Sequence, residues 1–282
     1  MNLKNKELDL NSKSDGIRIC EICGEPQGKE IILLGKVHIV PVMCKCKKEE
    51  SEKNRIRADA TEKQTRLQQV FNNSLMTKEF KEFTFENWDH EIGNKQMFSL
   101  AMKYTNNFKK MKKENLGLLI YGEPGNGKTF LSGCISNKLL SQMIPVVCVS
   151  SIGLLDRIKR NFNKWGDSGT EQILNCLDNA DLVIIDDLGT ENDTAWSRSI
   201  IYQVIDSRYR KKKPLIITTN LAMENLKRRY DKDCEKGEER TYSRLIEMCT
   251  PIRNTMTSIR LKKSADKTEM LKKLLKYWGR EN

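Results

Sequence analysis

The residues with the clearest chemical potential lie in one short loop. Residues 122–129 read GEPGNGKT, the spacing of a phosphate-binding P-loop. Glycine allows the tight backbone turns that aim successive N–H groups at phosphate oxygens. Lys128 would reach the β- and γ-phosphates of ATP, and the Thr129 hydroxyl would ligate Mg²⁺. The predicted nucleotide-binding residues here are Gly122, Glu123, Pro124, Gly125, Asn126, Gly127, Lys128, Thr129 and Phe130.

The sequence around this loop supports nucleotide binding. An apolar run at 118–121 has the pattern of a buried strand, and 130–140 has the pattern of a helix. A P-loop requires this strand–loop–helix order, with the positive end of the helix dipole at the phosphates. The alternative, a Gly/Pro turn that happens to carry a lysine, does not explain the order.

Two carboxylates follow a second apolar run. Residues 182–185 are LVII and lead directly into Asp186 and Asp187. A strand buried on both faces has this continuous pattern, and its carboxyl end faces the ligand crevice of a parallel sheet. We expect Asp186 to hold Mg²⁺ together with Thr129, and Asp187 to orient or polarise the attacking water. A core strand followed by a helix-starting Asp is the alternative.

Three more residues complete a candidate catalytic group. Asn220 follows the apolar run 215–219 and would offer its amide to the γ-phosphate or the lytic water, unless it only forms a turn. Arg240 and Arg244 share one helix face, because they are four residues apart. Phosphoryl transfer needs positive charge at the γ-phosphate, so we expect an arginine finger here rather than a solvated helix face. The predicted catalytic residues are Asp187, Asn220, Arg240 and Arg244.

A separate group of cysteines lies near the N-terminus. Cys20 and Cys23 form one pair, Cys44 and Cys46 a second, and the spacing suits a closed tetrahedral zinc site. The segments 31–34 and 37–42 predict a hairpin that turns at residues 35–36, as in a zinc ribbon. So small a module cannot build a core, so a metal would supply its folding free energy. His38 replacing one thiol, a redox pair and unligated thiols are alternatives.

These groups need an α/β scaffold. Strand-like runs at 118–121, 146–150, 182–186, 215–219 and 255–260 alternate with helical stretches, which predicts a parallel sheet with helices on both faces. The expected organisation is a disordered tail at 1–16, a zinc-binding module at 17–48, a helical linker at 49–82, an ATPase domain at 83–262 and a basic helix or tail at 263–282.

Composition narrows the class of protein. The 282 residues carry a net charge of +12, which favours a polyanionic partner such as nucleic acid. No apolar run approaches the ~20 residues of a membrane span, so we expect no membrane partner. The nine cysteines are an odd number, and five lie singly in the predicted ATPase region. This usage suits a reducing compartment, and we expect a cytoplasmic protein.

The order of these groups resembles that of AAA+ ATPases, and within them the DnaC/DnaI-type replicative helicase loaders and their phage relatives. Further matches are 85–88 (FENW), 117–129, 186–190 (DDLGT), 218–220 (TTN) and 243–248 (SRLIEM). The cysteine module is similar to that of many Gram-positive and phage loader-like proteins. The resemblance covers residues 17–262 and implies a P-loop AAA+ sheet with flanking helices behind a small zinc-ribbon-like module.

The resemblance implies an ATP-dependent loader. The N-terminal module would bind a hexameric replicative helicase, and the AAA+ domains would self-associate and hold single-stranded DNA. The arginine finger would then act on the neighbour's nucleotide. Arg260 matches the sensor 2 arginine of the family and would contact nucleotide, although the usual helical lid is missing or reduced. Asp187 stands where many AAA+ motors have glutamate, which suggests slow hydrolysis suited to a switch.

DNA contact has three candidate segments: 159–165, 208–213 and 262–280. In the first, Phe162 and Trp165 alternate with basic residues, as in single-strand platforms, or else belong to the core. The second reads most simply as a solvated loop. We expect binding to be independent of base sequence and to weaken with salt. An IstB-type ATPase that assists a transposase and a non-catalytic nucleic-acid adaptor are the alternative functions.

Overall fold

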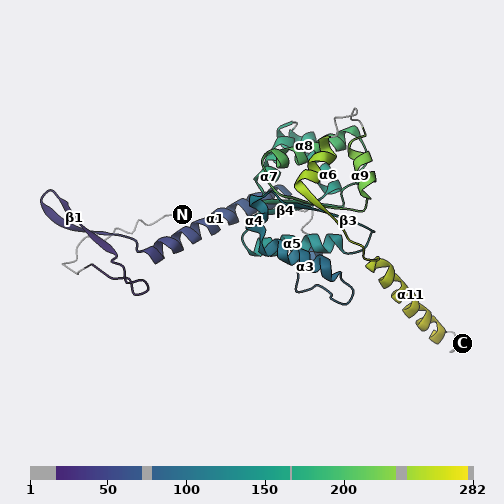
Figure 1. Cartoon of the computed structure of the whole chain (residues 1–282), viewed down its shortest axis with the longest axis horizontal. Coiled ribbons are helices and arrows are strands. Elements are labelled where there is room, and N and C mark those ends of the chain that lie inside the picture. Colours follow the sequence, from purple (N-terminus) through teal and green to yellow (C-terminus); the bar gives the residue numbers. More distant parts are fainter. Residues whose placement is uncertain (1–16, 72–77, 166, 233–239, 279–282) are drawn as a thin grey trace. The chain divides into compact units, whose positions relative to one another are not determined.

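The computed structural model describes residues 17–71, 78–165, 167–232 and 240–278. The chain forms two units, Met1–Asp59 and Ala60–Asn282 (Figure 1). The helix α1 (Lys45–Phe71) begins in the first unit and ends in the second. None of the helices in the described parts of the chain has the length and apolar character that a bilayer span requires.

The first unit contains a two-stranded antiparallel ribbon, β1 (Gly28–Leu33) and β2 (Lys36–Pro41). Leu33 pairs with Lys36, so the turn consists of Leu34 and Gly35, one residue earlier than expected. Both turn residues have positive φ, at 50° and 73°, the conformation of the type I′ turns that suit twisted hairpins. The predicted hairpin is confirmed.

The second unit is built on a five-stranded sheet in the order β4-β5-β6-β3-β7, in which every pairing is parallel. Its strands are β3 (Gly117–Tyr121), β4 (Val146–Ser150), β5 (Leu182–Asp186), β6 (Leu215–Thr219) and β7 (Cys249–Arg253). Every residue of β5 and β6 is buried, as expected for central strands covered on both faces. The predicted α/β fold with a parallel sheet is confirmed.

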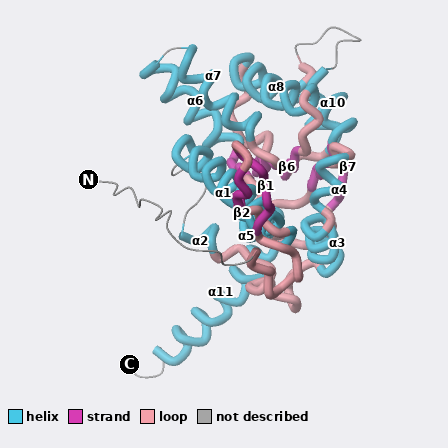
Figure 2. Tube along the Cα trace, turned by 90° about the vertical axis from the view of Figure 1, so that its left-hand side faces the viewer, coloured by secondary structure: helices cyan, strands magenta, loops and turns pink. Residues whose placement is uncertain are grey.

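Two hydrophobic cores lie on opposite faces of the sheet. Successive strand residues alternate between them, so that Leu119 belongs to one core while Leu118 and Ile120 belong to the other. One core includes residues of α3 (Lys95–Asn106), α4 (Phe108–Lys113) and α5 (Lys128–Ser141). The other includes residues of α6 (Ser151–Trp165), α7 (Asp167–Asn179), α8 (Ala195–Arg210), α9 (Met223–Tyr230) and α10 (Arg240–Met248). Figures 1 and 2 show these two helical layers, and the short α2 (Lys78–Lys81) precedes α3 in the chain.

The expected strand at 255–260 is wrong. The fifth strand is β7, which pairs with β3 from Cys249 to Arg253, and α11 (Ile259–Trp278) begins where the strand was expected. Pro251 obscures the strand in the sequence, yet it is tolerated because β7 lies at the edge of the sheet. The backbone N–H of Asn254 donates to the Tyr121 carbonyl, and the chain then leaves the sheet. Along α11, residues 260–275 are exposed.

Candidate nucleotide-binding site

The P-loop lies between β3 and α5, and its glycines are sterically required. Gly125 and Gly127 have φ of +79° and +91°. A Cβ on Gly122 would lie 2.3 Å from the Asn254 carbonyl oxygen, and one on Gly125 would lie 2.5 Å from Ser258 Oγ. Only residues without a side chain fit these close approaches. The first helical residue is Lys128, so the positive end of α5 lies at the loop.

The ammonium group of Lys128 is buried and held by its own loop. Its Nζ donates to the carbonyl oxygens of Gly122 and Glu123, each at 2.8 Å. A third bond, of 3.1 Å, runs to Asn126 Oδ1. Burial lowers the pKa of Lys128, and the nearby carboxylates Asp187 and Asp186 oppose that shift. A phosphate group at this point would replace neutral oxygens with charged ones, which form stronger bonds to an ammonium group.

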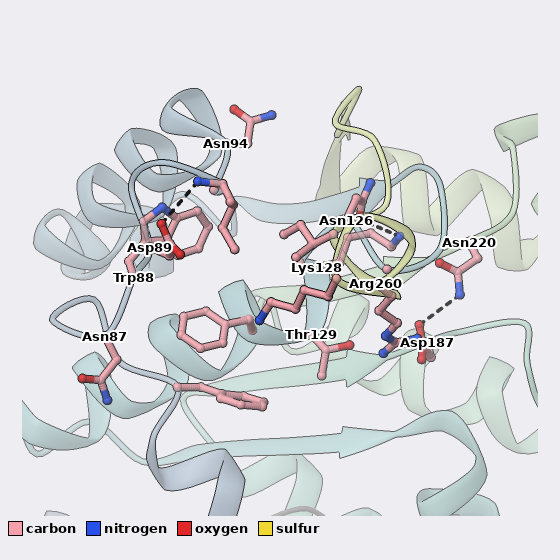
Figure 3. A pocket seen from close by; sticks show the side chains of 18 residues that line it. Asn87, Trp88, Asp89, Asn94, Asn126, Lys128, Thr129, Asp187, Asn220 and Arg260 are labelled. Carbon is pink, nitrogen blue, oxygen red and sulfur yellow. Dashed lines mark hydrogen bonds between the residues drawn. The ribbon is translucent and has the colours of Figure 1, made fainter. Parts of the chain in front are cut away.

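A cavity of about 510 Å³ opens beside the P-loop (Figure 3). Its apolar and aromatic lining residues are Phe83, Trp88, Ile92, Phe130 and Ile259. The polar lining residues are Asn87, Asp89, Asn94, Asn126, Lys128, Thr129, Asp187, Asn220, Arg260 and Lys263. The volume falls within the range of small-molecule sites. A lining that combines aromatic side chains with polar and charged ones suits a nucleotide, with its flat base and its phosphates.

The carboxylates lie where β5 ends, beside the end of β6. Thr218 donates its hydroxyl to Asp186 Oδ1 at 2.7 Å, and its Oγ1 accepts the backbone N–H of Asp187 at 2.9 Å. The side chain of Asn220 donates to Asp187 Oδ1 at 3.2 Å. Asp187 has a φ of +53°, in the left-handed region. These bonds hold its backbone in a sparsely populated conformation beside the pocket.

Asp186 is poised for a cation. Burial raises the pKa of its carboxyl group, while hydrogen bonds from Thr218 and Thr129 lower it. The second of these bonds shows that Thr129 and Asp186 are in contact. An oxygen pair of this kind, one carboxylate and one hydroxyl beside a phosphate site, fits the ligand preference of Mg²⁺. The donor set therefore fits the expected metal.

The two arginines of α10 have different surroundings. Arg244 Nη1 lies 2.5 Å from Asp206 Oδ1 and 2.7 Å from the Tyr202 hydroxyl. Its guanidinium also stacks over the rings of Tyr202 and Tyr209, at 5.1 and 5.5 Å from their centroids. Arg240 is exposed at the first residue of the helix. Neither residue lines the pocket of its own chain, whereas Arg260 does.

The cysteines form a second candidate site, in the other unit. The ligand atoms of Cys20, Cys23, Cys44 and Cys46 all lie within 4.8 Å of one another. The Sγ atom of Cys46 is 3.2 to 3.6 Å from the other three sulfurs. Four sulfurs bound to one zinc at about 2.3 Å would lie roughly 3.8 Å apart, so the cluster is close to that geometry.

The position of His38 favours an all-cysteine ligand set. His38 faces Ile31 across the ribbon, and it is not among the residues that the described structure gathers in the cluster. Backbone N–H groups of Cys23 and Ile22 lower the pKa of the Cys20 thiol to about 6. A lowered pKa favours the thiolate, the form in which cysteine binds metal.

The structure changes the interpretation of one of the three candidate DNA-contact segments, residues 208–213. Arg208 is fully buried and donates to four carbonyl oxygens, those of Leu177, Ala180, Asp181 and Pro214. Lys211 pairs with Asp178 at 2.5 Å, and Lys213 donates to the Asp178 carbonyl. The expected solvated loop at 208–213 is therefore wrong at Arg208, which is buried in α8, whereas residues 210–212 are exposed as expected. In α6, Lys159 and Arg160 are exposed. The side chains of Phe162 and Trp165 lie outside the described part of the structure.

Sequence reasoning missed several residues of the pocket. Phe83, Asn87 and Ile92 precede the sheet in the chain and line the cavity only through the tertiary fold. Lys263 and Ile259 reach it from the first turns of α11. Thr218 carried a usable signal, because it is a polar residue at the end of an apolar run beside the predicted carboxylate strand.

A parallel sheet with a P-loop after one strand, carboxylates after a second and a polar residue after a third defines an ATP-binding protein of the AAA+ type. Similarity to known proteins identifies the family. Residues 49–267 match the family described as IstB-like ATP binding protein. The chain belongs to this IstB/DnaC family.

Two of the relatives described here are named replicative helicase loaders. The replicative helicase loader DnaC of Escherichia coli K12 is 32% identical over 182 residues, which is 63% of this chain and 72% of that protein. DnaC of Buchnera aphidicola (strain Bp) is 31% identical over 168 residues, 58% of this chain and 66% of that protein. A phage-like element PBSX protein, XkdC of Bacillus subtilis, is 29% identical over 180 residues, 61% of each chain.

Solved structures confirm the fold. The crystal structure of the DnaC helicase loader superposes with a TM-score of 0.53 at 23% identity, covering 63% of this chain and 99% of that one. The crystal structure of DnaI gives 0.53 at 22% identity, covering 64% and 94%. The predicted AAA+ sheet with flanking helices is confirmed.

Proposed function

We propose that this chain is an ATP-dependent loader that places a replicative hexameric helicase on single-stranded DNA, with ATP binding and hydrolysis as the switch. The observation that carries the proposal is a candidate ATP site that brings Lys128, Thr129, Asp187 and Asn220 to one cavity. The chain is also 32% identical over 182 residues to a protein named replicative helicase loader. Family membership supports ATP binding by this chain. The loader role is carried over to this chain from its relatives.

In the proposed site, the P-loop amides and Lys128 bind the phosphates of ATP. The aromatic lining residues Phe83, Trp88 and Phe130 would receive the purine base, because a flat apolar surface stacks well against aromatic rings. The three rings lie together, since the Phe130 centroid is 4.8 Å from that of Phe83 and 5.8 Å from that of Trp88. Arg260 adds positive charge from the start of α11. When ATP binds, its phosphate oxygens would replace the neutral loop oxygens that accept hydrogen bonds from Lys128 Nζ in this structure.

Hydrolysis would depend on the carboxylate edge. Thr129 and Asp186 would hold Mg²⁺, which screens charge on the β- and γ-phosphates. Asp187, oriented by the Asn220 amide, would accept a hydrogen bond from the attacking water and take up its proton. The side chain of aspartate is one methylene shorter than that of glutamate, so we expect slow turnover. Slow turnover suits a switch that must persist until the helicase is engaged.

The cysteine cluster would hold a structural zinc and thereby fold a helicase-binding module at residues 17–48. Residues 1–16 and 72–77, parts of the expected tail and linker, lie outside the described residues. The ATPase domain at 83–262 would self-associate and hold single-stranded DNA. Exposed basic residues that could contact the phosphates are Lys159 and Arg160 on α6 and Lys262, Lys267 and Lys272 on α11.

We further propose Arg240 as the arginine finger, acting on a neighbouring subunit. Arg240 is exposed at the first residue of α10, which suits contact with another chain. Arg244 pairs with Asp206 and stacks on two tyrosines, so its removal should mainly loosen α10 from α8. Arg240→Ala should spare ATP binding and lower turnover of the assembled protein about a hundredfold or more. Turnover at saturating ATP, measured beside the dissociation constant for ATP, tests this.

A mixing experiment separates a finger in trans from a local effect. The Arg240→Ala chain can still bind ATP but lacks the finger. The Lys128→Ala chain keeps the finger but cannot bind ATP. Mixed together, the two inactive variants should regain part of the wild-type turnover, because each supplies what the other lacks. A mixture as inactive as its components would reject Arg240 as a finger acting on a neighbour.

The loader function itself is tested on closed circular single-stranded DNA, which a preformed helicase ring cannot enter from an end. The chain and ATP should increase the amount of cognate helicase that stays on the circle, and the Lys128→Ala chain should not. Equal retention with and without the chain would refute the proposal.

The family description offers a second candidate, an IstB-type ATPase that assists a transposase. Both functions share the ATP site, so the pocket does not separate them. The cysteine cluster favours the loader, because the helpers of transposition usually begin with a helical segment without a metal site. Capture of a transposase rather than a helicase by the full chain would support this alternative. A chain that binds ATP without turnover under any condition would instead be a non-catalytic adaptor.

A further inference from the structure

We propose that Asn254 is a positioning residue for nucleotide binding, which holds the P-loop in the shape that receives phosphate. The proposal rests on the ATP-binding function proposed above. Asn254 follows β7 and is only 3% exposed, and it does not line the pocket. It would therefore act on the nucleotide only through its neighbours.

A reciprocal pair of hydrogen bonds joins Asn254 to the P-loop. Its Nδ2 donates to the Asn126 carbonyl at 3.0 Å, and Asn126 Nδ2 donates to the Asn254 carbonyl at 3.1 Å. The remaining oxygen of the Asn126 amide accepts from Lys128 Nζ. A single residue, Asn126, thus links Asn254 to Lys128, the residue proposed to bind the phosphates.

On its other side, Asn254 reaches the wall of the pocket. Its Oδ1 accepts from Asn94 Nδ2 at 3.0 Å and from the Met256 backbone at 3.3 Å. Asn94 lines the cavity, and its own Oδ1 caps α3 by accepting two backbone N–H groups. Each amide in this chain of three asparagines therefore has its donor and acceptor sides assigned by its partners. The chain joins the pocket wall, the edge strand and the P-loop.

The segment after β7 also supports the P-loop through its backbone. The Asn254 carbonyl lies where a Cβ on Gly122 would be, and the Ile259 N–H donates to the Gly125 carbonyl at 2.9 Å. Without the Asn254 amide, the loop would lose a buried bond at its centre and relax before nucleotide arrives. Binding would then have to reorder the loop, which costs affinity.

The test is a titration of each purified full-length variant with magnesium and a fluorescent ATP analogue. Asn254→Ala should raise the dissociation constant about tenfold, the effect of one buried hydrogen bond, and Asn126→Ala should do the same from the other side of the link. Turnover of Asn254→Ala at saturating ATP should stay near wild type, because this substitution leaves the residues at the γ-phosphate untouched. Amide hydrogen exchange at residues 122, 123 and 125–127 should be faster in the nucleotide-free variants than in the nucleotide-free wild-type protein.

The matched control is Thr105→Val. Thr105 is equally buried in α3, and its hydroxyl bonds only to carbonyls of its own helix, at 3.0 Å. The control should lose stability yet bind the analogue normally. Wild-type affinity in Asn254→Ala, or an affinity loss that Thr105→Val reproduces, would overturn the positioning role alone. A wild-type chain that binds no analogue would refute the ATP site as well.

Discussion

Lys128→Ala is expected to abolish ATP binding, with a dissociation constant raised at least about a hundredfold. The side chain is 4% exposed, and its ammonium group is the buried cation at the centre of the P-loop. Charge-assisted hydrogen bonds to phosphate contribute about 1.5–3 kcal/mol each, and alanine removes all of those that Lys128 makes. Titration with a fluorescent ATP analogue measures the loss.

The control for this variant is Lys138→Ala, in the last turn of the same helix α5. It removes an equal charge away from the pocket, so ATP affinity should be unchanged. Melting temperatures without nucleotide should show that both variants fold. Unchanged affinity in a folded Lys128→Ala protein would refute the P-loop assignment.

Replacing Cys20 and Cys23 together by serine is expected to release about one zinc equivalent per chain and to unfold only the N-terminal module. The buried apolar side chains of residues 17–44 are those of Cys20 and Cys44, whereas Ile31, Ile32 and Leu33 of the ribbon are exposed. A ribbon without an apolar core depends on another source of folding free energy. Structural zinc supplies about 10–16 kcal/mol in small zinc-binding peptides.

Zinc content and amide exchange measure this loss. Exchange should become fast across 17–44 in the double variant, while ATP binding by the second unit should persist. Cys176→Ser is the control, because Cys176 lies in α7 and outside the cluster, so the variant should keep its zinc. A wild-type protein that is purified without chelator and contains no metal would contradict the zinc assignment.

The sequence predicted those parts of the site that are contiguous in the chain. The P-loop and Asp186 follow apolar strands directly, so local pattern and chemistry coincide there. Thr218 and Asn254 act through partners 32 and 128 residues away, at Asp186 and Asn126, and no local pattern announces such pairs. The wall residues Phe83 and Trp88 depend equally on tertiary packing.

The errors have physical causes as well. The β-branched residues Thr255, Thr257 and Ile259 have strand propensity, but β3 has already made its last pairing when the chain reaches Asn254. Arg208 looks solvated in the sequence because its partners, the carbonyls of Leu177 and Ala180 at the end of α7, are 31 and 28 residues away in the chain. Burial of that guanidinium lowers its pKa to about 10. The guanidinium group of Arg208 therefore has a structural role.

ATP turnover by the full chain, with and without single-stranded DNA and the cognate replicative helicase, tests the central claim most directly. We predict slow basal turnover that changes when DNA or helicase is added, because a loading switch must respond to what it loads. Turnover indifferent to both would contradict the loader function and direct attention to a transposase or another DNA-remodelling partner.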